Sequence, residues 1–255
     1  MNVKNICIIL IVAAAIASTY LYLKKKSLAP TTDPNVLVVG TSADFPPFSF
    51  NKDGVIVGFD IDLATEICKH LNKKMVLKDM PFDTLIPQLQ LGTMHIIAAG
   101  MTATPERAQK VNFTKPHLLS DPLIVITLAK NPPITSLDEL NGKDVVVNEG
   151  YTADTYMSKL QGPILKRLPS TSDAFMAINN GRGYAFVTAR NTVKAFFDQY
   201  GAQKYNVYEI PGTSENDALL VSKKYPALLD QVQKVLDAMQ ADGSLQNIKK
   251  KWGLA

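Results

Sequence analysis

The sequence predicts an α/β protein of two lobes that are connected by two hinge crossings. Short apolar strands alternate with amphipathic helical segments, which is typical of parallel sheets covered by helices. This alternation occurs in two successive series, and strand-like segments near residues 121 and 217 connect them. The chain has 255 residues, of which 46% are hydrophobic and 20% charged, a length and composition that suit one large or two small globular domains.

The first 26 residues form a separate segment, which we interpret as a signal peptide or a membrane anchor. Lys4 precedes a mostly apolar run from Ile6 to Leu23, and three lysines follow. Together with the small residues Ala15-Ile16-Ala17 before Ser18, this pattern indicates a cleaved export signal. The apolar run also approaches the length of a bilayer span, so an uncleaved tether is the alternative.

The charge balance argues against a nucleic-acid-binding protein. The formal net charge of +4 comes from lysines of residues 1–26, and the rest of the chain is balanced, with 23 basic and 23 acidic residues. Nucleic-acid binding needs a clustered basic excess instead. We also expect no cofactor and no metal, because His70, His95 and His117 lack the spacing of metal ligands. Cys68 occupies an apolar helical position, which favours a buried, inert thiol.

The first series follows a linker rich in proline and threonine, residues 27–35. Apolar side chains recur at every fourth position from Phe59 to Leu71, which predicts an amphipathic helix. The expected elements of this series are the strand Val36–Gly40, the helix Phe59–Leu71, the strand Met75–Lys78, the helix Phe82–Leu91 and the strand His95–Ala99.

The second series begins beyond the apolar strand Leu123–Leu128, after the break at Asn131-Pro132-Pro133. Ser136 and Glu139 fit a capping box, and a helix is expected from Thr155 onward. Further strands are expected at Asp144–Asn148, Ile164–Leu168, Tyr184–Val187, Tyr205–Ile210 and Ala218–Val221, and terminal helices at Ala227–Met239 and Ser244–Trp252.

The segment from Thr102 to Thr114 points to an anion-binding site. Thr104 followed by Pro105 predicts a helix start, because a threonine cap and a proline suit the unpaired amides there. Arg107 falls in the first turn, where a cation costs roughly 0.3 to 1 kcal/mol unless an anion is bound. A carboxylate ligand would satisfy both charges. An arginine that is solvated or paired with a nearby acid is the alternative.

Six segments in this order resemble the bacterial extracellular solute-binding proteins of the polar amino-acid group, which supply ABC importers. The ending KKWGL is similar to that of arginine-binding members. The segments are GTSADFPPFSF (residues 40–50), GFDIDL (58–63), FDTLIPQ (82–88), GMTATPER (100–107), NEGYT (148–152) and the stretch from Asp242-Gly243 to Trp252-Gly253.

The resemblance implies the type II periplasmic-binding-protein fold, with residues 36–120 and 217–255 in lobe 1 and residues 121–216 in lobe 2. It also implies a periplasmic monomer, rather than an enzyme, that binds an amino acid as its small-molecule ligand and docks on an inner-membrane ABC permease. The alternatives are an exported dehydratase that acts on prephenate-like acids, and a tethered ligand sensor.

The family's binding residues map onto eight positions of this chain. Arg107 would bind the ligand α-carboxylate, because a planar guanidinium can contact both carboxylate oxygens. The Thr102 hydroxyl and the backbone amides around Gly100 and Thr152 would assist it. The remaining four positions would contact other parts of the ligand.

Phe45 and Phe82 match the positions whose rings pack on the ligand side chain, a surface suited to a guanidinium through cation–π contact. Ordinary core packing is the alternative for both rings. Ser42 and Glu149 match positions that make polar contacts with the distal end or the amine of the ligand. The phenyl rings and the neutral Ser42 leave arginine, lysine, glutamine and aromatic ligands open, and Asp44 and Glu149 slightly favour a cationic one.

One departure from the family pattern concerns the ligand ammonium. The acidic residue that usually holds this group is replaced here by Ala189. A buried ammonium without a partner would be costly, so either another acid compensates or the ligand is not a standard α-amino acid. The candidates are Glu149, Glu215 and Asp217. Glu149 is the working hypothesis, and under it Glu149→Gln should weaken binding at least tenfold.

Overall fold

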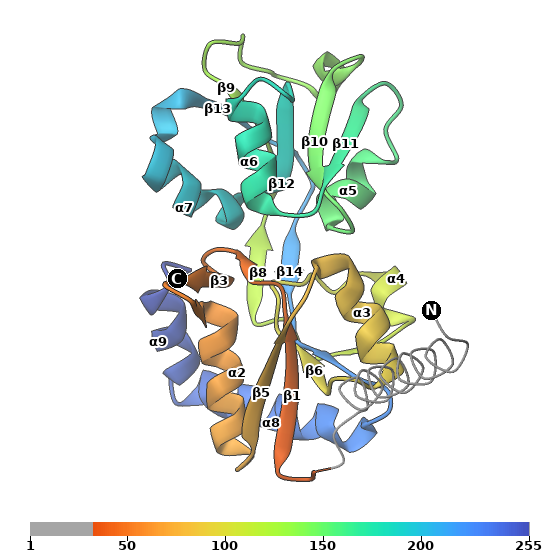
Figure 1. Cartoon of the computed structure of the whole chain (residues 1–255), viewed down its shortest axis with the longest axis vertical. Helices are drawn as coiled ribbons and strands as arrows, with labels where there is room; N and C mark the ends of the chain where they lie inside the picture. Colours follow the sequence, from red (N-terminus) through yellow and green to blue (C-terminus); the bar gives the residue numbers. More distant parts are fainter. Residues whose placement is uncertain (1–32, 255) are drawn as a thin grey trace, which may run out of the picture. The chain divides into compact units, whose positions relative to one another are not determined.

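The computed structural model describes residues 33–254, in which strands alternate with helices as expected for an α/β protein (Figure 1). The expected leader and most of the expected linker lie outside these residues. Within the described part, none of the helices combines the length and the apolar character that a membrane span requires.

The first sheet has the strand order β5-β1-β6-β15-β7. Its strands are β1 (Val36–Thr41), β5 (Lys74–Asp79), β6 (Ile96–Ile97), β7 (Asn112–Phe113) and β15 (Leu220–Val221). A small sheet precedes β5 in the chain and consists of β2 (Asp44–Phe45), β3 (Ser49–Lys52) and β4 (Val55–Val57). The helices that pack on the first sheet or on one another are α2 (Phe59–His70), α3 (Phe82–Leu91), α8 (Pro226–Ala241) and α9 (Ser244–Lys251).

Helix α2 shows why this sequence forms these elements. Its stripe of Phe59, Leu63 and Ile67 is fully buried, as the four-residue spacing predicts. Cys68, on the same helix, is also buried, and burial raises the pKa of its thiol to about 11. The thiol is therefore protonated at neutral pH and unreactive, in agreement with the prediction.

The second sheet has the strand order β11-β10-β12-β9-β13. On β10, Val145 and Val147 face one apolar cluster and Val146 faces another, because successive side chains of a strand point to opposite faces. Helix α5 packs in the first cluster, and α6 and α7 pack in the second. The elements are β9 (Leu123–Leu128), β10 (Asp144–Asn148), β11 (Ile164–Leu168), β12 (Ala185–Ala189), β13 (Tyr205–Glu209), α5 (Thr152–Met157), α6 (Thr171–Asn179) and α7 (Arg190–Tyr200).

The prediction of parallel strands is wrong for β9 and β15. Strand β9 runs antiparallel to β12 and β13, and β15 runs antiparallel to β6 and β7. Parallel neighbours need a long crossover, usually a helix, whereas each of these two strands enters its sheet directly from an extended segment. Both sheets are therefore mixed.

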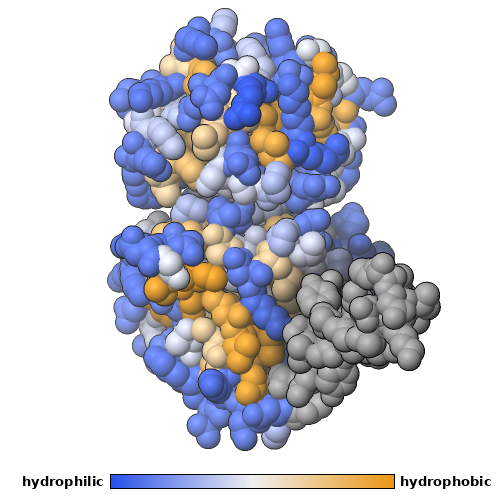
Figure 2. Space-filling view, in the orientation of Figure 1, coloured by the Kyte–Doolittle hydropathy of each residue, from blue (hydrophilic) through white to orange (hydrophobic). Residues whose placement is uncertain are grey.

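Those extended segments are β8 (Leu118–Asp121) and β14 (Glu215–Asp217), which pair antiparallel and lie between the two sheets (Figure 1). They agree with the two hinge crossings expected near residues 121 and 217. We call the first sheet with its helices lobe 1 and the second sheet with its helices lobe 2; the residue boundaries of the lobes stay a prediction. Hydrophilic residues cover most of the face of both lobes that Figure 2 shows.

The local start signals have mixed outcomes. The capping box of Ser136 and Glu139 is present, at the start of the short helix η1 (Leu137–Leu140). Helix α5 begins at Thr152, three residues before the predicted Thr155. A second short helix, η2 (Ala202–Lys204), precedes β13.

Candidate ligand-binding site

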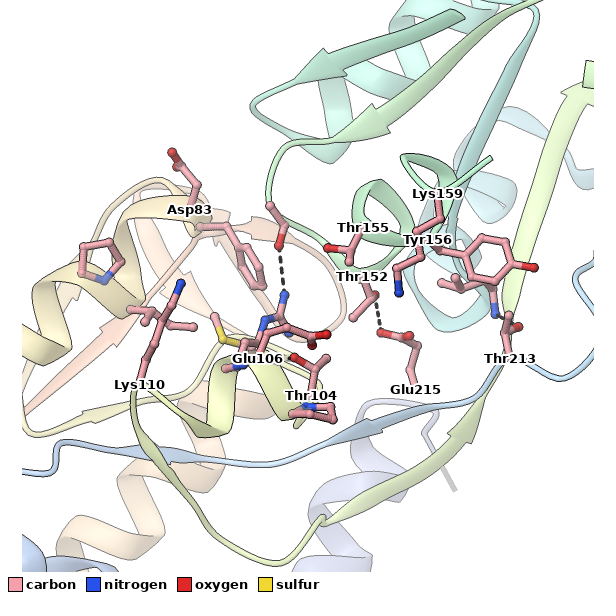
Figure 3. Close-up of a pocket in the computed structure, with 18 of the residues that line it drawn as sticks. Asp83, Thr104, Glu106, Lys110, Thr152, Thr155, Tyr156, Lys159, Thr213 and Glu215 are labelled. Carbon is pink, nitrogen blue, oxygen red and sulfur yellow. Dashed lines mark hydrogen bonds between the residues drawn. The ribbon is translucent and has the colours of Figure 1, made fainter. Parts of the chain in front are cut away.

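Two cavities in the described part of the chain border Arg107. The larger has a volume of about 690 Å³ and lies among residues of α3, α4 (Pro105–Ala108) and α5 and of the segment that leads into β14 (Figure 3). The smaller has a volume of about 20 Å³ and is bordered by residues of both lobes. Phe82, Arg107, Thr152 and Glu215 line both cavities.

The local fold around Arg107 confirms the predicted helix cap but weakens the dipole argument. The Thr104 hydroxyl accepts a hydrogen bond from the Arg107 backbone amide at 3.3 Å, and Pro105 occupies the first turn. However, α4 has only four residues. A helix dipole grows with the number of aligned peptides, so its repulsion of Arg107 is smaller than the sequence suggested.

The guanidinium of Arg107 is held by neutral groups. Its Nη1 donates to the Thr102 carbonyl oxygen at 2.8 Å, and its Nη2 donates to the Gly150 carbonyl oxygen at 2.9 Å. Its Cζ lies 5.5 Å from the ring centre of Phe82. None of the ion pairs among residues 33–254 includes Arg107. The alternative of an arginine paired with a local acid therefore has no support in this conformation.

Burial lowers the pKa of Arg107, and the nearby carboxyl groups of Glu215 and Asp217 act in the opposite direction. Because the unperturbed pKa of arginine is far above neutral, the guanidinium remains charged. A positive charge in partly desolvated surroundings, bonded to carbonyl dipoles alone, is suited to an anionic ligand group.

Three aromatic rings meet at the smaller cavity. The centroid of Tyr151 lies 4.2 Å from that of Phe82 and 5.5 Å from that of Phe45. Tyr151 is 7% exposed, and its hydroxyl makes no hydrogen bond of acceptable geometry within the described residues. A volume of about 20 Å³ suffices for roughly one water molecule. A ligand that packs on Phe45 and Phe82 therefore requires a movement of Tyr151 or of the lobes.

The smaller cavity also has an acidic wall. Asp121, Glu215 and Asp217 line it, and they come from the paired strands β8 and β14. The Thr102 hydroxyl lies 2.6 Å from Glu215 Oε2 and 3.1 Å from Asp217 Oδ1. The Thr152 hydroxyl donates to the same Glu215 oxygen at 2.5 Å (Figure 3). Glu215 thus connects Thr102 of lobe 1 with Thr152 of lobe 2.

Burial is the main cause of the shifted pKa values on this wall. It raises the pKa of Asp217 to about 7, with a further contribution from the charge of Glu215. It raises the pKa of Asp121 to about 6, although hydrogen bonds from backbone amides of α7 partly stabilise the ionised form. Burial and the charge of Asp217 also raise the pKa of Asp60, which lies behind this wall.

The structure gathers six of the eight residues expected to form the site. These six line one or both cavities: Phe45, Phe82, Gly100, Thr102, Arg107 and Thr152. The Gly100 amide donates to Asp60 Oδ2 at 2.6 Å, so in this conformation it is not free for a ligand. Gly100 has φ +52°, and a Cβ there would lie 2.7 Å from the Phe45 ring, so the ring's position depends on a glycine.

The other two expected residues lie away from the cavities. Ser42 is buried and donates to Asp44 Oδ1 at 2.9 Å, while Asp44 Oδ2 accepts from the Thr171 amide at 3.3 Å. Ser42 therefore orients a carboxylate that connects β2 to α6. Glu149 is exposed and borders neither cavity. The working hypothesis that Glu149 holds the ligand ammonium finds no support in this geometry.

Sequence reasoning missed Asp121 and Tyr151. The available signals were positional: Asp121 lies at an expected crossing, and Tyr151 lies within the NEGYT segment. Neither signal assigned a role to the side chain. Among the described residues, no group of three or more His, Cys, Asp or Glu side chains is arranged to hold a metal ion.

Known proteins with similar sequences are named for amino-acid binding. A probable histidine-binding protein of Campylobacter jejuni is 30% identical over 86% of this chain and 85% of its own length. The ABC transporter arginine-binding protein 1 of Escherichia coli is 31% identical over 84% of this chain and 88% of its own length.

Solved structures support the same relationship. An ancestral arginine-binding protein bound to arginine superimposes with a TM-score of 0.81 at 36% identity, covering 86% of this chain and 98% of that one. This match confirms the two-lobe α/β fold. The profile of the bacterial extracellular solute-binding proteins, family 3, matches residues 37–255. The resemblance inferred from six sequence segments is thus confirmed, and the chain belongs to the bacterial extracellular solute-binding proteins, family 3.

Proposed function

We propose that this protein is the extracytoplasmic substrate-binding protein of an ABC amino-acid importer, and that it closes two lobes on a polar amino acid. It would act as an exported monomer and deliver its ligand to an inner-membrane permease. The observation that carries the proposal is Arg107, a guanidinium beside two cavities that is bonded to two backbone carbonyls and to none of the described carboxylates.

In this proposal the ligand α-carboxylate binds the guanidinium of Arg107 and displaces at least one of its carbonyl partners. The Thr102 and Thr152 hydroxyls, one from each lobe, are close enough to one another to share Glu215 and could both contact the ligand. A ligand that touches both lobes stabilises the closed arrangement by its higher affinity for that state. The permease would then recognise the closed form.

Arginine is the first candidate ligand. Two of the similar proteins described above are named for arginine and one for histidine. The rings of Phe45 and Phe82 offer apolar faces for an aliphatic stem or a guanidinium. We therefore favour a cationic amino acid over a neutral one.

An exported dehydratase is the second candidate, and one observation favours it. Asp217 lies beside the carboxylate-binding Arg107, and its pKa of about 7 is suited to general acid or base catalysis at neutral pH. The similar proteins cited here are named as binding proteins, which is why we rank this candidate lower.

A thermal-shift screen of the purified protein against the standard L-amino acids tests both candidates. A ligand that binds only the folded state stabilises it by about 2.7 kcal/mol at 100 times its Kd. We expect the largest shift with arginine, and no turnover when prephenate or arogenate is added. The absence of a shift with every amino acid would overturn the receptor proposal, and turnover would establish the dehydratase.

A further inference from the structure

We propose that the carboxyl groups of Glu215 and Asp217, on the crossing strand β14, hold the ammonium group of the ligand. This inference rests on the proposed function, because it assumes a ligand with both a carboxylate and an ammonium. In this proposal Glu215 and Asp217 take the role of the family's usual acid, whose position is Ala189 here. The proposal also replaces the working hypothesis that Glu149 holds the ammonium.

The first support is the composition of the smaller cavity. Ala189 lines it and offers no charge, and the acidic residues that the described part of the chain contributes to its lining are Asp121, Glu215 and Asp217. Asp121 already accepts hydrogen bonds from the Asn191 amide at 3.1 and 3.2 Å, at the start of α7. Glu215 and Asp217 contact the hydroxyls of Thr102 and Thr152 instead, which can rotate away, so these two acids are better placed to serve a ligand.

The second support is that these acids lack a cationic partner. Glu215 lies directly opposite Asp121 in the antiparallel pair of β14 and β8, and like charges in that position repel each other. None of the ion pairs among residues 33–254 includes Asp121, Glu215 or Asp217. Such an arrangement is unfavourable without a cation or a proton, and a bound ammonium would supply the missing charge.

The hydrogen bonds also indicate that, without a ligand, a proton on one of the acids supplies the missing positive charge. The Thr102 hydroxyl lies within hydrogen-bond distance of both Glu215 and Asp217 but carries a single hydrogen atom. Both contacts are satisfied together if Asp217 is protonated and donates to the Thr102 oxygen. A ligand ammonium carries three donors and could replace this proton.

A third, independent support comes from the buried hydroxyl of Thr188, which lines the same cavity. Thr188 is 2% exposed, and its hydroxyl has no hydrogen-bond partner in residues 33–254. Buried hydroxyls are normally paired, so its unused capacity indicates that a polar group occupies this space in another state. The hydroxyl of the neighbouring Tyr151 lies instead near Thr171 and Asp44.

The spacing of the two charged regions suits an α-amino acid. The Thr102 carbonyl binds Arg107 at 2.8 Å, and the Thr102 hydroxyl binds Glu215 at 2.6 Å. One residue therefore connects the anion-binding and cation-binding sides. In an α-amino acid the carboxylate and the ammonium are attached to the same carbon, so they need partners that are this close together.

Ligand binding should consequently release protons near neutral pH. Arg107, Asp60, Asp121 and Glu215 are the charged groups that influence Asp217, and its pKa of about 7 leaves it partly protonated at neutral pH. An ammonium beside the carboxylate favours its ionised form, so Asp217 would lose its proton when the ligand binds.

The test uses the full protein and isothermal titration calorimetry. The probes are L-arginine, L-histidine and L-glutamine, each compared with the analogue that lacks the α-amino group. In the wild type, each amino acid that binds should bind at least tenfold more tightly than its analogue. Glu215→Gln and Asp217→Asn should each weaken amino-acid binding at least tenfold and leave analogue binding within about threefold. The matched control Glu66→Gln removes an exposed carboxylate on α2 that pairs with Lys69.

A rescue variant separates a ligand contact from a structural role. Adding Ala189→Asp to Glu215→Gln returns an acid to the same cavity and should recover at least part of the lost affinity. If either variant fails to fold, the wild type itself provides the test. Its binding enthalpy, measured at pH 7 in buffers of different ionisation enthalpy, should show that ligand binding releases protons.

The outcomes distinguish this inference from the proposed function. Retained affinity in Glu215→Gln and Asp217→Asn, or the absence of proton release, would overturn the ammonium site, whereas the amino-acid receptor would stand. Failure of the wild type to bind any amino acid would overturn both proposals.

Discussion

The anion-binding side and the cation-binding side of the smaller cavity are built from different kinds of structure. Arg107 belongs to a single helical turn, α4, and its cap and carbonyl partner Thr102 lie within five residues of it in the sequence. Glu215 and Asp121 meet only because β14 pairs with β8. A local motif therefore supplies one charge, and the connection between the lobes supplies the other.

This difference has a mechanical consequence. Helix α4 lies between β6 and β7 of lobe 1 in the chain, whereas the acids lie on the two strands that pass between the lobes. A ligand ammonium bound there would contact the crossing segment itself. The ligand charge would then act on the part of the chain that must change when the lobes open and close.

The largest expected effect concerns the anion-binding side. Arg107→Ala should weaken amino-acid binding by roughly 3 kcal/mol or more, which corresponds to an increase in Kd of more than about a hundredfold. The reason is that the variant leaves the buried carboxylate of the ligand without its partner. Arg107→Lys should recover only part of this loss, since lysine cannot form the bidentate contact. Calorimetric titration measures both.

The matched control for this prediction is Arg182→Ala, which removes an exposed arginine between α6 and β12 that lines neither cavity. Unchanged affinity in Arg107→Ala would show that the carboxylate binds elsewhere, and the comparison between the two sides would lose its basis.

The contrast between a local motif and the pairing of distant strands also explains how much could be predicted from the sequence. Helix α3 runs from Phe82 to Leu91 as predicted, because Pro81 precedes it and Gly92 ends it in the left-handed conformation. The cap at Thr104 was equally predictable. These features depend on neighbours within about four residues, which a periodic or capping pattern contains.

Features that depend on distant partners were not predictable in this way. The reversed directions of β9 and β15 and the opposition of Glu215 and Asp121 arise from strand pairing between remote segments. Pairing of this kind leaves no mark in the local pattern of either strand. Of the six expected residues that line the cavities, Arg107 was indicated by a local helix start and the other five by family motifs, and their individual roles stay predictions.

The second prediction concerns the stability of the cation-binding side. An unfolded aspartate has a pKa near 3.8, while that of folded Asp217 is about 7, so the native state binds more protons between these values. The contribution of Asp217 to stability is therefore fully present below about pH 4 and is lost as the pH rises through about 7. Asp121 acts in the same direction, up to about pH 6.

Asp217→Asn should reduce this pH dependence in the ligand-free protein and leave the part that comes from Asp60 and Asp121, whose pKa values burial also raises. Thermal unfolding of wild type and variant at several pH values between about 4 and 8 measures the effect. The control is Asp198→Asn, which changes an exposed carboxylate beside Lys194 on α7. Parallel curves for wild type and Asp217→Asn would contradict the raised pKa.

The third prediction sharpens the role of Tyr151, which occupies the space between the two sides. Because its buried hydroxyl has no partner among the described residues, Tyr151→Phe should stabilise the ligand-free protein by about 1 kcal/mol. Tyr205→Phe is the matched comparison with the opposite expected sign, since the Tyr205 hydroxyl donates to Asn179 Oδ1 at 2.7 Å. Denaturant unfolding of both variants provides the test, and a destabilised Tyr151→Phe would indicate a hydrogen bond that this conformation lacks.

The smallest expected effect is that of Glu149→Gln. Side chains alternate along a strand, and the buried Asn148 at the end of β10 is followed by Glu149, which is exposed. The residue that a sequence match favoured for the ammonium therefore faces solvent. We now expect Glu149→Gln to change amino-acid affinity less than twofold, whereas the sequence-based hypothesis required at least tenfold. If calorimetry shows a tenfold loss of affinity, Glu149 of lobe 2 would be the residue that binds the ammonium. The distinction between a local anion site and a cation site on the crossing strands would then be wrong.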